Sequence, residues 1–406
     1  MHPGGVTAQK RSATTVKRHF VSFSNKQHGI VLTDSPNNHI HQLSHTCPRV
    51  HVPLQVDGLQ GSIRRGYRWC SGSVSSRRAP TTQESVGASS GDQSFRITAT
   101  TSRQRPLLKL CADTLGKMNL EEYFERIGFH GSFDKPDLAT LKLIHKQHVM
   151  SVPFENLSIH CGEKNVMDLD AAFNKIVRRG RGGWCLENNF LFGWVLREMG
   201  YDTTSLGSRV FDHSLNDFGP LDSHFINKVV IDGKAYITDV SFGMSFQLWE
   251  PLELVSGMDQ PQAAGVFRLL DQGEMWVLEK TGRKPEVLNP EFAKSSLVKR
   301  NETNQIYCFT LVPREAEHFL EINHKLQNET SLFTNKSICS LQAPTGFRAL
   351  IGWTYGEVTY KPDEGVDVLD IRNIMDDEIE QILLEKFNIK LQNKLQPVNN
   401  KSHYTF

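Results

Sequence analysis

Charge is distributed unevenly along this 406-residue chain, and the asymmetry limits which part can form a packed core. Residues 1–117 carry 16 Lys and Arg against 5 Asp and Glu, whereas residues 118–406 carry 30 against 40. The first segment is also rich in Ser, Thr, Gly and His and shows no sustained helical or strand period. Such a composition cannot bury enough apolar surface to offset chain entropy. We therefore predict a disordered basic extension over 1–117 and a folded region after it.

Three interpretations of the basic extension remain open at the level of sequence. It resembles a mitochondrial transit peptide, because it is Ser-rich and no acidic residue precedes Asp34. Alternatively, it is a basic arm that contacts nucleic-acid phosphates. The third interpretation is that translation begins at Met118 and that the preceding residues are an isoform-specific or wrongly assigned extension. We expect a cytoplasmic protein and leave mitochondrial targeting open.

Hydropathy and cysteine usage exclude several classes of protein. No window holds the roughly 18 consecutive apolar residues that a membrane-spanning helix needs. The seven cysteines are odd in number and form no CxxC pair, which disfavours a disulfide scaffold and a cysteine-ligated zinc site. We expect a reducing compartment, no metal, and at least one cysteine that is free for chemistry. The cysteines are Cys47, Cys70, Cys111, Cys161, Cys185, Cys308 and Cys339.

Hydrophobic periodicity predicts a helical region followed by a β-rich region and a smaller mixed region. Helices are expected over 119–127, 137–150, 168–179, 185–200 and 376–387. Strands are expected over 225–231, 235–240, 265–269, 275–278, 306–311, 337–341 and 348–355. In the second helix, the residues expected to face inward are Leu138, Leu141, Leu143 and Ile144.

The segment Arg-Gly-Gly-Trp-Cys-Leu-Glu-Asn-Asn, residues 181–189, holds the first candidate for chemistry. Its two glycines permit a tight turn, after which a helical stripe begins, so Cys185 lies in the first helical turn. There the unpaired N–H groups and the helix dipole favour a thiolate, and Arg181 adds positive charge. Taken alone, a cysteine in such a position is more often a buried structural residue.

A predicted hairpin supplies two further candidates. The segments 224–231 and 234–240 flank Asp-Gly at 232–233, which is a strong signal for a two-residue turn. In the resulting register, Asp239 and His224 are diagonal neighbours on one face of the hairpin, up to about 7–8 Å apart at Cβ. An imidazole and a carboxylate can meet across that distance. Together with Cys185 they suggest a Cys-His-Asp nucleophilic triad.

Residues 181–189 match the signature R-G-G-x-C-x-[EQ]-x-N, and the chain is identified as similar to the arylamine N-acetyltransferase family of the vertebrate cytosolic type. The resemblance covers 118–406 and is carried further by YFERIG at 123–128, VPFEN at 152–156, PLELVSG at 251–257 and YTF at 404–406. It implies an α+β fold in which a helical bundle (118–205) is followed by a β-barrel (206–310) with a papain-like site and an α/β lid (311–406).

The resemblance also implies a ping-pong reaction. Cys185 would take the acetyl group of acetyl-CoA, and His224 and Asp239 would complete the triad. The acceptors would be arylamines and hydrazines at nitrogen, or arylhydroxylamines at oxygen. We expect these small molecules and coenzyme A as the only partners, with no nucleic acid or membrane, and a monomeric protein. Arg126 and Glu155 are expected to support the site, with an ordinary ion pair between two helices as the alternative.

Further positions follow from the resemblance for the two substrates. Coenzyme A contacts are implied at Pro220, Ser223, Lys325, Ser331 and His403. The acceptor pocket is implied to be lined by Phe154, Ser223, Phe242, Met244 and Phe246, which predicts a narrow flat slot for a small aromatic ring. The human type 1 enzyme of the family has Arg where this chain has Met244, which predicts a preference for neutral acceptors over carboxylated ones.

Two other functions remain open at the level of sequence, a thiol hydrolase and a non-enzymatic scaffold. A papain-like or transglutaminase-like hydrolase would share the triad but needs an extended groove for a peptide. A non-enzymatic scaffold with a basic arm would have no thiol sensitive to alkylation. The product formed from p-nitrophenyl acetate, with and without an arylamine, separates these functions.

Overall fold

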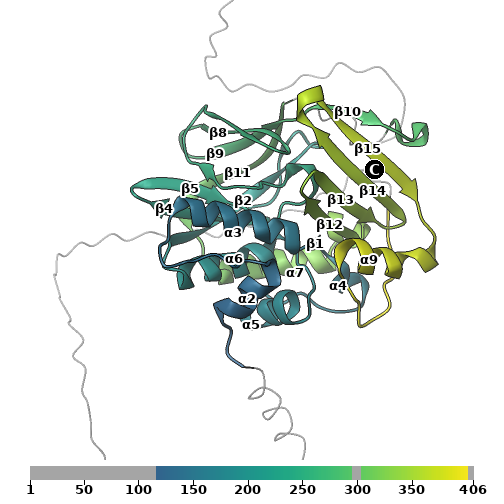
Figure 1. Cartoon of the computed structure of the whole chain (residues 1–406), viewed down its shortest axis with the longest axis horizontal. Coiled ribbons are helices and arrows are strands. Elements are labelled where there is room, and N and C mark those ends of the chain that lie inside the picture. The colour runs from purple at the N-terminus through teal and green to yellow at the C-terminus, as the bar shows by residue number, and fades with distance from the viewer. Residues whose placement is uncertain (1–115, 295–302, 401–406) are drawn as a thin grey trace, which may run out of the picture. The chain divides into compact units, whose positions relative to one another are not determined.

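The computed structural model describes residues 116–294 and 303–400 (Figure 1). Most of the predicted basic extension therefore lies outside the described residues, as do His403 and the 404–406 match. Among the helices of the described part, none combines the length and hydrophobicity that a membrane span requires.

The described chain opens with helices, as predicted. The Asn119 side chain caps the first helix by accepting a hydrogen bond from the Glu122 N–H, and Gly128 ends it with a φ of 68°. The Asp137 side chain caps the second in the same way. The helices of this region are α2 (Leu120–Ile127), α3 (Leu138–Ser151), α4 (Leu157–His160), α5 (Leu169–Phe173) and α6 (Cys185–Glu198). The predicted helix 168–179 continues beyond α5 as a π-helical turn, η1 (Asn174–Arg178).

One residue of α3 was assigned to the wrong face. Leu143 is 46% exposed, although the sequence predicted that it faces inward. At 100° per residue, Leu143 lies about 200° from Leu141 around the helix, so the two cannot share a face. The buried face consists instead of Leu141, Ile144, His145, His148 and Val149.

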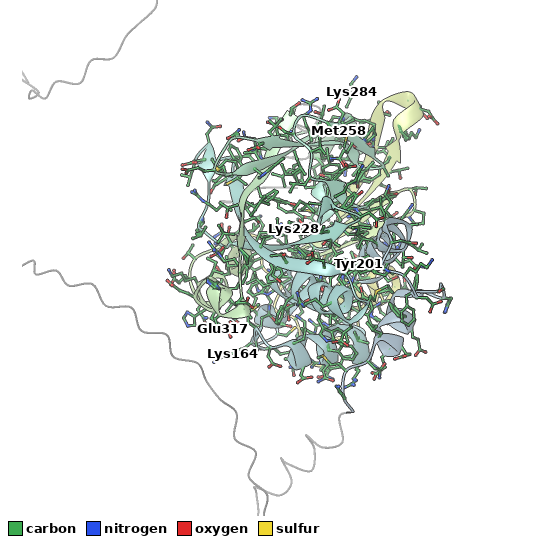
Figure 2. The ribbon with its side chains drawn as sticks, turned by 90° about the vertical axis from the view of Figure 1, so that its left-hand side faces the viewer. Lys164, Tyr201, Lys228, Met258, Lys284 and Glu317 are labelled. Atoms are coloured by element: carbon green, nitrogen blue, oxygen red, sulfur yellow. The ribbon has the colours of Figure 1, made fainter. Side chains whose placement is uncertain are left out.

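A nine-stranded, nearly closed barrel sheet follows the helices. Its order is β6-β5-β4-β2-β11-β9-β8-β7, with β3 paired to β2. The strand β2 lies between β4 and β11. The sequence did not predict β2, because its residues are mostly polar. The paired strands β2 and β4 cross the view of Figure 2 near Tyr201 and Lys228. The strands are β2 (Asp202–Asp212), β3 (Asp217–Phe218), β4 (His224–Ile231), β5 (Lys234–Thr238), β6 (Leu252–Glu253), β7 (Asp259–Gln262), β8 (Gly265–Asp271), β9 (Trp276–Thr281) and β11 (Thr303–Pro313).

The hairpin between β4 and β5 has the predicted register. Ile231 pairs with Lys234, and the pairing continues to Asn227 opposite Thr238. The turn residues Asp232 and Gly233 both have positive φ values, 50° and 78°, as a two-residue hairpin turn of this type requires. The register sets the face on which the side chains beyond the last pair lie.

The second sheet has six strands in the order β1-β12-β13-β14-β15-β10. Its strands are β1 (Phe154–Glu155), β10 (Lys284–Val287), β12 (Ile338–Ala343), β13 (Gly346–Ile351), β14 (Thr354–Lys361) and β15 (Val366–Asn373). The prediction of one strand over 348–355 was wrong, because the chain turns at Gly352, with a φ of 56°, and returns as β14.

The remaining helices belong to the C-terminal part. The helix α9 (Ile379–Phe387) is preceded by the short turn η7 (Asp376–Glu378) and packs onto the six-stranded sheet (Figure 1). Its buried side chains are Ile379, Ile382, Leu383 and Phe387. The helices α7 (Leu320–Asn328) and α8 (Leu332–Asn335) follow β11 after the turn η5 (Ala316–Phe319). Side chains of η5, α7 and α8 join a cluster with the start of α6, which places the C-terminal part against the predicted nucleophile.

Candidate active site

His224 and Asp239 meet at the open end of the β4–β5 hairpin. The imidazole Nε2 lies 2.7 Å from the carboxylate Oδ2, and both side chains are buried. His224 is the first residue of β4, and Asp239 follows the last residue of β5, so the hairpin register brings them together. The His–Asp contact predicted from the turn is thus confirmed.

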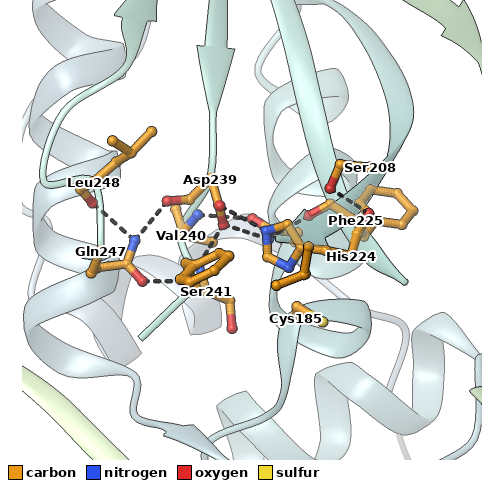
Figure 3. Close-up of polar contacts among 12 residues, drawn as sticks. Cys185, Ser208, His224, Phe225, Asp239, Val240, Ser241, Gln247 and Leu248 are labelled. Atoms are coloured by element: carbon orange, nitrogen blue, oxygen red, sulfur yellow. Dashed lines mark hydrogen bonds and ion pairs between the residues drawn. The ribbon is translucent and has the colours of Figure 1, made fainter. Parts of the chain in front are cut away.

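Cys185 lies next to this pair at the first residue of α6 (Figure 3). Cys185 is close enough to His224 to raise the pKa of the imidazole, and the Cys185 Sγ lies 4.0 Å from the Ser223 carbonyl oxygen. Since Asp239 occupies Nε2 of the ring, Nδ1 is the nitrogen that faces the thiol. The structure therefore places a nucleophile, a base and a carboxylate side by side in space, with the imidazole between the thiol and the carboxylate (Figure 3).

The electrostatics of the site favour an ion pair. Burial disfavours the charged imidazole, but the charges of Asp239 and Cys185 and the hydrogen bonds to both outweigh it and raise the pKa of His224 to about 10. Burial likewise opposes ionisation of Asp239, yet the His224 charge and several hydrogen bonds keep the pKa of the carboxyl below its usual value. The geometry thus keeps the His224 imidazole charged and the Asp239 carboxyl ionised.

Several groups to which the sequence analysis assigned no role fix Asp239. Asn189, one turn after Cys185 on α6, donates to Oδ1 at 2.8 Å, and the Ser241 N–H donates to the same oxygen at 3.0 Å. Gln247 donates to the Asp239 carbonyl oxygen at 2.6 Å (Figure 3). Two signals were available for Asn189: it is the last residue of the signature over 181–189, and its i to i+4 spacing from Cys185 places both side chains on the same side of α6.

Tyr307 on β11 is a further buried neighbour of the pair. Its ring centroid lies 5.3 Å from that of His224. Burial and then the charge of Asp239 raise the pKa of its phenol well above the usual value, so the hydroxyl stays protonated. The sequence offered no signal for Tyr307, since β11 is adjacent to the hairpin only through β2.

The loop before Cys185 is held by close backbone contacts. The Gly183 N–H donates to the Pro153 carbonyl oxygen at 3.2 Å, and the Glu155 N–H donates to the Gly183 carbonyl oxygen at 2.9 Å. A Cβ on Gly182 would lie 2.1 Å from the Pro153 carbonyl oxygen, so only glycine fits there. These contacts attach the nucleophile loop to β1 and so to the six-stranded sheet.

The predicted roles of the charged residues near this loop need correction. Glu155 is paired with Arg181 at 2.9 Å and not with Arg126, so the alternative of an Arg126–Glu155 ion pair was wrong. The Arg181 guanidinium is bonded to Glu155 and to the Ser158 hydroxyl, so its charge is paired with a carboxylate, which the sequence interpretation did not anticipate. Arg126 donates to the backbone carbonyl oxygens of Ser151, Ile176, Gly180 and Arg181, which fixes the approach to the nucleophile loop.

A second buried ion pair lies beneath the first turn of α6. The Lys175 ammonium on η1 lies 2.9 Å from both carboxylate oxygens of Glu187 and 4.0 Å from Glu155. Glu187 also accepts a hydrogen bond from the Trp184 N–H at 3.2 Å, at the residue that caps the helix. The pair thus ties the π-helical turn to the start of the Cys185 helix.

The apolar residues expected around an acceptor come together beside His224. The Phe242 ring stands edge-on to the imidazole at 5.1 Å and to the Phe246 ring at 6.0 Å. The Met244 N–H donates to the Ser340 hydroxyl at 3.4 Å, and Phe154 on β1 pairs with Ser340 in the sheet. The structure therefore gathers Phe154, Phe242, Met244 and Phe246 around the chain segment that follows Asp239.

The residues expected to contact coenzyme A are more widely distributed. Ser223 precedes His224, and its carbonyl oxygen faces Cys185. Lys325 is exposed on α7 and paired with Glu321, whereas the Ser331 hydroxyl donates to the Leu326 carbonyl oxygen and caps α8. Pro220 is exposed in the turn before β4, and these four positions remain predictions. Within 116–294 and 303–400, no group of three or more His, Cys, Asp or Glu side chains is arranged to hold a metal.

Comparisons with known proteins agree with this arrangement. A family model described as N-acetyltransferase matches residues 137–396. The pineal gland isozyme NAT-10 of arylamine N-acetyltransferase from Gallus gallus is 50% identical over 289 residues, which are 71% of this chain and 100% of that protein. Arylamine N-acetyltransferase 1 from Homo sapiens is 42% identical over the same shares of the two chains.

Solved structures give the same result for the fold. The arylamine N-acetyltransferase of Mycobacterium marinum in complex with CoA has a TM-score of 0.57 and 26% sequence identity, covering 67% of this chain and 93% of that chain. The Mycobacterium tuberculosis enzyme has a TM-score of 0.58 at 26% identity, covering 67% and 94%. The chain therefore belongs to the arylamine N-acetyltransferase family of acetyltransferase enzymes.

Proposed function

We propose that this protein transfers the acetyl group of acetyl-CoA to the nitrogen of arylamines and hydrazines, and to the oxygen of arylhydroxylamines, through an acetyl-cysteine intermediate on Cys185. One observation carries the proposal. The buried His224 imidazole hydrogen-bonds to Asp239 through Nε2 and lies beside Cys185, which occupies the first turn of a helix. The family membership supports the reaction class, and a structural relative is described in complex with CoA.

In the first half-reaction, the Cys185 thiolate attacks the thioester carbonyl carbon. A sulfur–carbon bond forms, the bond to the coenzyme A sulfur breaks, and the leaving thiolate takes the proton of the His224 imidazolium. In the second, the amine nitrogen attacks the acetyl-cysteine, gives its proton to His224, and releases the cysteine thiolate. Exchange between two thioesters is nearly balanced in energy, so the acetyl-enzyme stays reactive toward the amine.

We assign acceptor binding to Phe154, Ser223, Phe242, Met244 and Phe246. The Phe242 ring lies edge-on to the imidazole, so an arylamine packed against it would bring its nitrogen to the acetyl-cysteine. We assign coenzyme A to Pro220, Ser223, Lys325, Ser331 and His403. We also propose that 118–205, 206–310 and 311–406 act as a helical domain, a barrel domain and a lid domain.

The decisive experiment follows the acetyl group on the protein. After incubation with acetyl-CoA and no acceptor, mass spectrometry should show one acetyl group on Cys185 of the wild type. Cys185→Ser should retain the fold and lose both the label and arylamine acetylation, because oxygen replaces sulfur at nearly the same size. Labelling elsewhere, with activity retained in the variant, would sink the mechanism.

A second measurement separates the transferase from a thiol hydrolase. With p-nitrophenyl acetate, a transferase should form acetylated arylamine in an amount that rises with arylamine concentration. A hydrolase would release acetate at a rate that the arylamine does not change, and that outcome would contradict the proposal.

A further inference from the structure

His145 is a buried histidine on α3 that contacts Asp239 and has no part in the mechanism above. Its Nε2 accepts a hydrogen bond from the backbone N–H of Asp239 at 3.3 Å. Its Nδ1 lies 3.1 Å from the carbonyl oxygen of Trp249. One imidazole therefore contacts the backbone at both ends of the segment from 239 to 249.

The two contacts fix the protonation of the ring. A backbone N–H can only donate, so Nε2 carries no proton and the imidazole is neutral. Nδ1 then holds the ring proton and donates it to the Trp249 carbonyl oxygen, which can only accept. Burial agrees with a neutral ring, because it lowers the pKa of His145 to about 4 despite the nearby carboxylates.

The backbone amide of Asp239 lies beyond the last pair of the hairpin ladder, which is Asn227 with Thr238. Its N–H is therefore bonded to His145 from α3, its carbonyl oxygen to Gln247, and its carboxylate to Asn189, Ser241 and His224. Because each group is held from a different part of the chain, the direction of the carboxylate depends on all of them. The bond from α3 holds the backbone N–H, and the bond from Gln247 holds the backbone carbonyl oxygen.

The segment bridged by His145 also contains the assigned acceptor residues Phe242, Met244 and Phe246. Its far end is held through Trp249, to which His145 donates. The side chain thus joins two parts of the site: the carboxylate that orients His224 and the apolar segment beside it.

We infer that His145 is a positioning residue, which acts on Asp239 through the bond to Nε2 and on the acceptor segment through the bond from Nδ1. The inference rests on the proposed function, since it assumes that Asp239 orients His224 for acetylation of Cys185. The two bonds have separable effects, because two substitutions each retain one of them.

The matched variants are His145→Gln and His145→Asn. The Gln side-chain oxygen can reach the position of Nε2 and accept from the Asp239 N–H, whereas the Asn amide nitrogen can replace Nδ1 and donate to Trp249. The control is His148→Asn, one turn later on α3, where the buried imidazole is bonded to Tyr123.

The rate of Cys185 acetylation by acetyl-CoA is measured in single-turnover experiments with the full chain. We expect His145→Asn to slow acetylation at least tenfold, and His145→Gln to stay within about threefold of the wild type. His145→Gln should instead raise the KM for the arylamine. His148→Asn should lower the melting temperature without changing either quantity.

Equal acetylation rates for His145→Asn and His145→Gln would overturn the inference, as would an equal loss in His148→Asn. A wild type that forms no acetyl-Cys185 would overturn the proposed function itself, so the two failures are distinguishable. A further measurement tests the protonation of His145 in the wild type and does not depend on an activity assay. Nitrogen-15 NMR of labelled histidine should show the His145 ring protonated at Nδ1, and protonation at Nε2 would contradict the inference.

Discussion

At the scale of single residues, the charge of His224 depends on its two partners. Its pKa in the folded protein is about 10, well above the value of about 6.5 for an unfolded histidine. The charged ring therefore stabilises the fold fully below about pH 6.5, and this contribution is lost as the pH rises toward 10. The site should keep its imidazolium throughout the physiological range.

The first prediction compares the free energy of unfolding of the wild type and His224→Gln across pH. We expect the difference to be largest near pH 6 and to narrow steadily up to pH 9, because only the folded wild type holds the extra proton. Denaturant titrations at each pH measure it. A difference for His224→Gln that does not vary with pH would refute the prediction.

The second prediction concerns selection of the acceptor by Met244. A guanidinium binds a carboxylate bidentately, and hydrogen bonds to charged groups contribute about 1.5–3 kcal/mol. Methionine offers only apolar contact, so we expect the wild type to prefer neutral arylamines or hydrazines over p-aminobenzoate-like acids. Met244→Arg should improve kcat/KM for the acids about tenfold or more, as measured by steady-state kinetics on a matched acid and neutral pair.

Nearby basic residues are the alternative source of acid recognition. Arg209 donates to the carbonyl oxygens of Gly219 and Phe218, and Lys228 lies four residues along β4 from His224, about 13 Å away. Lys280 is nearer, since its ammonium donates to the Ser245 carbonyl oxygen and lies 5.5 Å from the Phe246 ring centroid. The prediction would be contradicted if the wild type already preferred acids and Lys280→Met abolished this preference. Lys280 would then bind the acceptor carboxylate in place of an arginine at position 244.

The sequence predicted some residue contacts and missed others for a physical reason. His224 and Asp239 are joined by a two-residue turn, so their contact follows from local register. The partners of Glu155 and the contact of His145 with Asp239 join segments far apart in sequence, and only the packing of α3 and η1 brings them together. The i to i+4 spacing of His145 from Leu141 was the available signal for its place on the buried face of α3, and the sequence analysis did not use it.

At the scale of elements, the Lys175–Glu187 pair fixes η1 against the start of α6. Removing one partner of a buried ion pair leaves an uncompensated charge and costs about 3–5 kcal/mol. The third prediction is therefore that Glu187→Gln lowers the free energy of unfolding by about that amount. The amide can still accept from the Trp184 N–H, so activity per folded molecule should be retained.

Chemical denaturation measures the free energy of unfolding of Glu187→Gln, Lys175→Met and the double variant, and so gives the coupling energy between the two charges. The double variant should recover part of the stability that either single variant loses, because no unpaired charge remains. Strict additivity would show that the two charges are not coupled. A proportional loss of activity in Glu187→Gln would show that the carboxylate itself is needed at the nucleophile.

Elements were predicted well where apolar residues recur with a clear period, as in α2 and α9. The prediction was incomplete for β2, whose 11 residues are mostly polar and pair on both sides. Over 348–355, a continuous apolar pattern concealed the turn at Gly352, because period alone does not show where a strand reverses. The π-helical η1 continues the helical pattern with a different hydrogen-bond spacing that composition does not reveal.

At the scale of the whole molecule, the two sheets are not built from consecutive segments of the chain. β1 comes from the predicted helical region and β10 from the predicted barrel region, yet both join the six-stranded sheet. β1 also bonds to the loop before Cys185. Sequence period assigns residues to elements, but it cannot show that two short strands are exchanged between regions, since each contributes only two to four residues.

The last prediction concerns the basic segment that precedes the family match. Relatives from Gallus gallus and Homo sapiens are matched over 100% of their length by 289 residues of this chain, and the family model begins at residue 137. All residues of the proposed site lie between Phe154 and His403. Deletion of residues 1–117 should therefore leave kcat/KM for an arylamine within a few-fold and the melting temperature within a few degrees.

The truncated protein should also keep α2 intact, because Asn119 caps this helix and remains at its start. A deletion of residues 1–124, which removes the cap and the buried Tyr123 that bonds to His148, is the matched comparison. It should lower the melting temperature clearly, since about 1 kcal/mol is lost with a cap alone and a buried aromatic side chain contributes more. If the shorter deletion were as damaging as the longer one, the basic segment would belong to the folded enzyme.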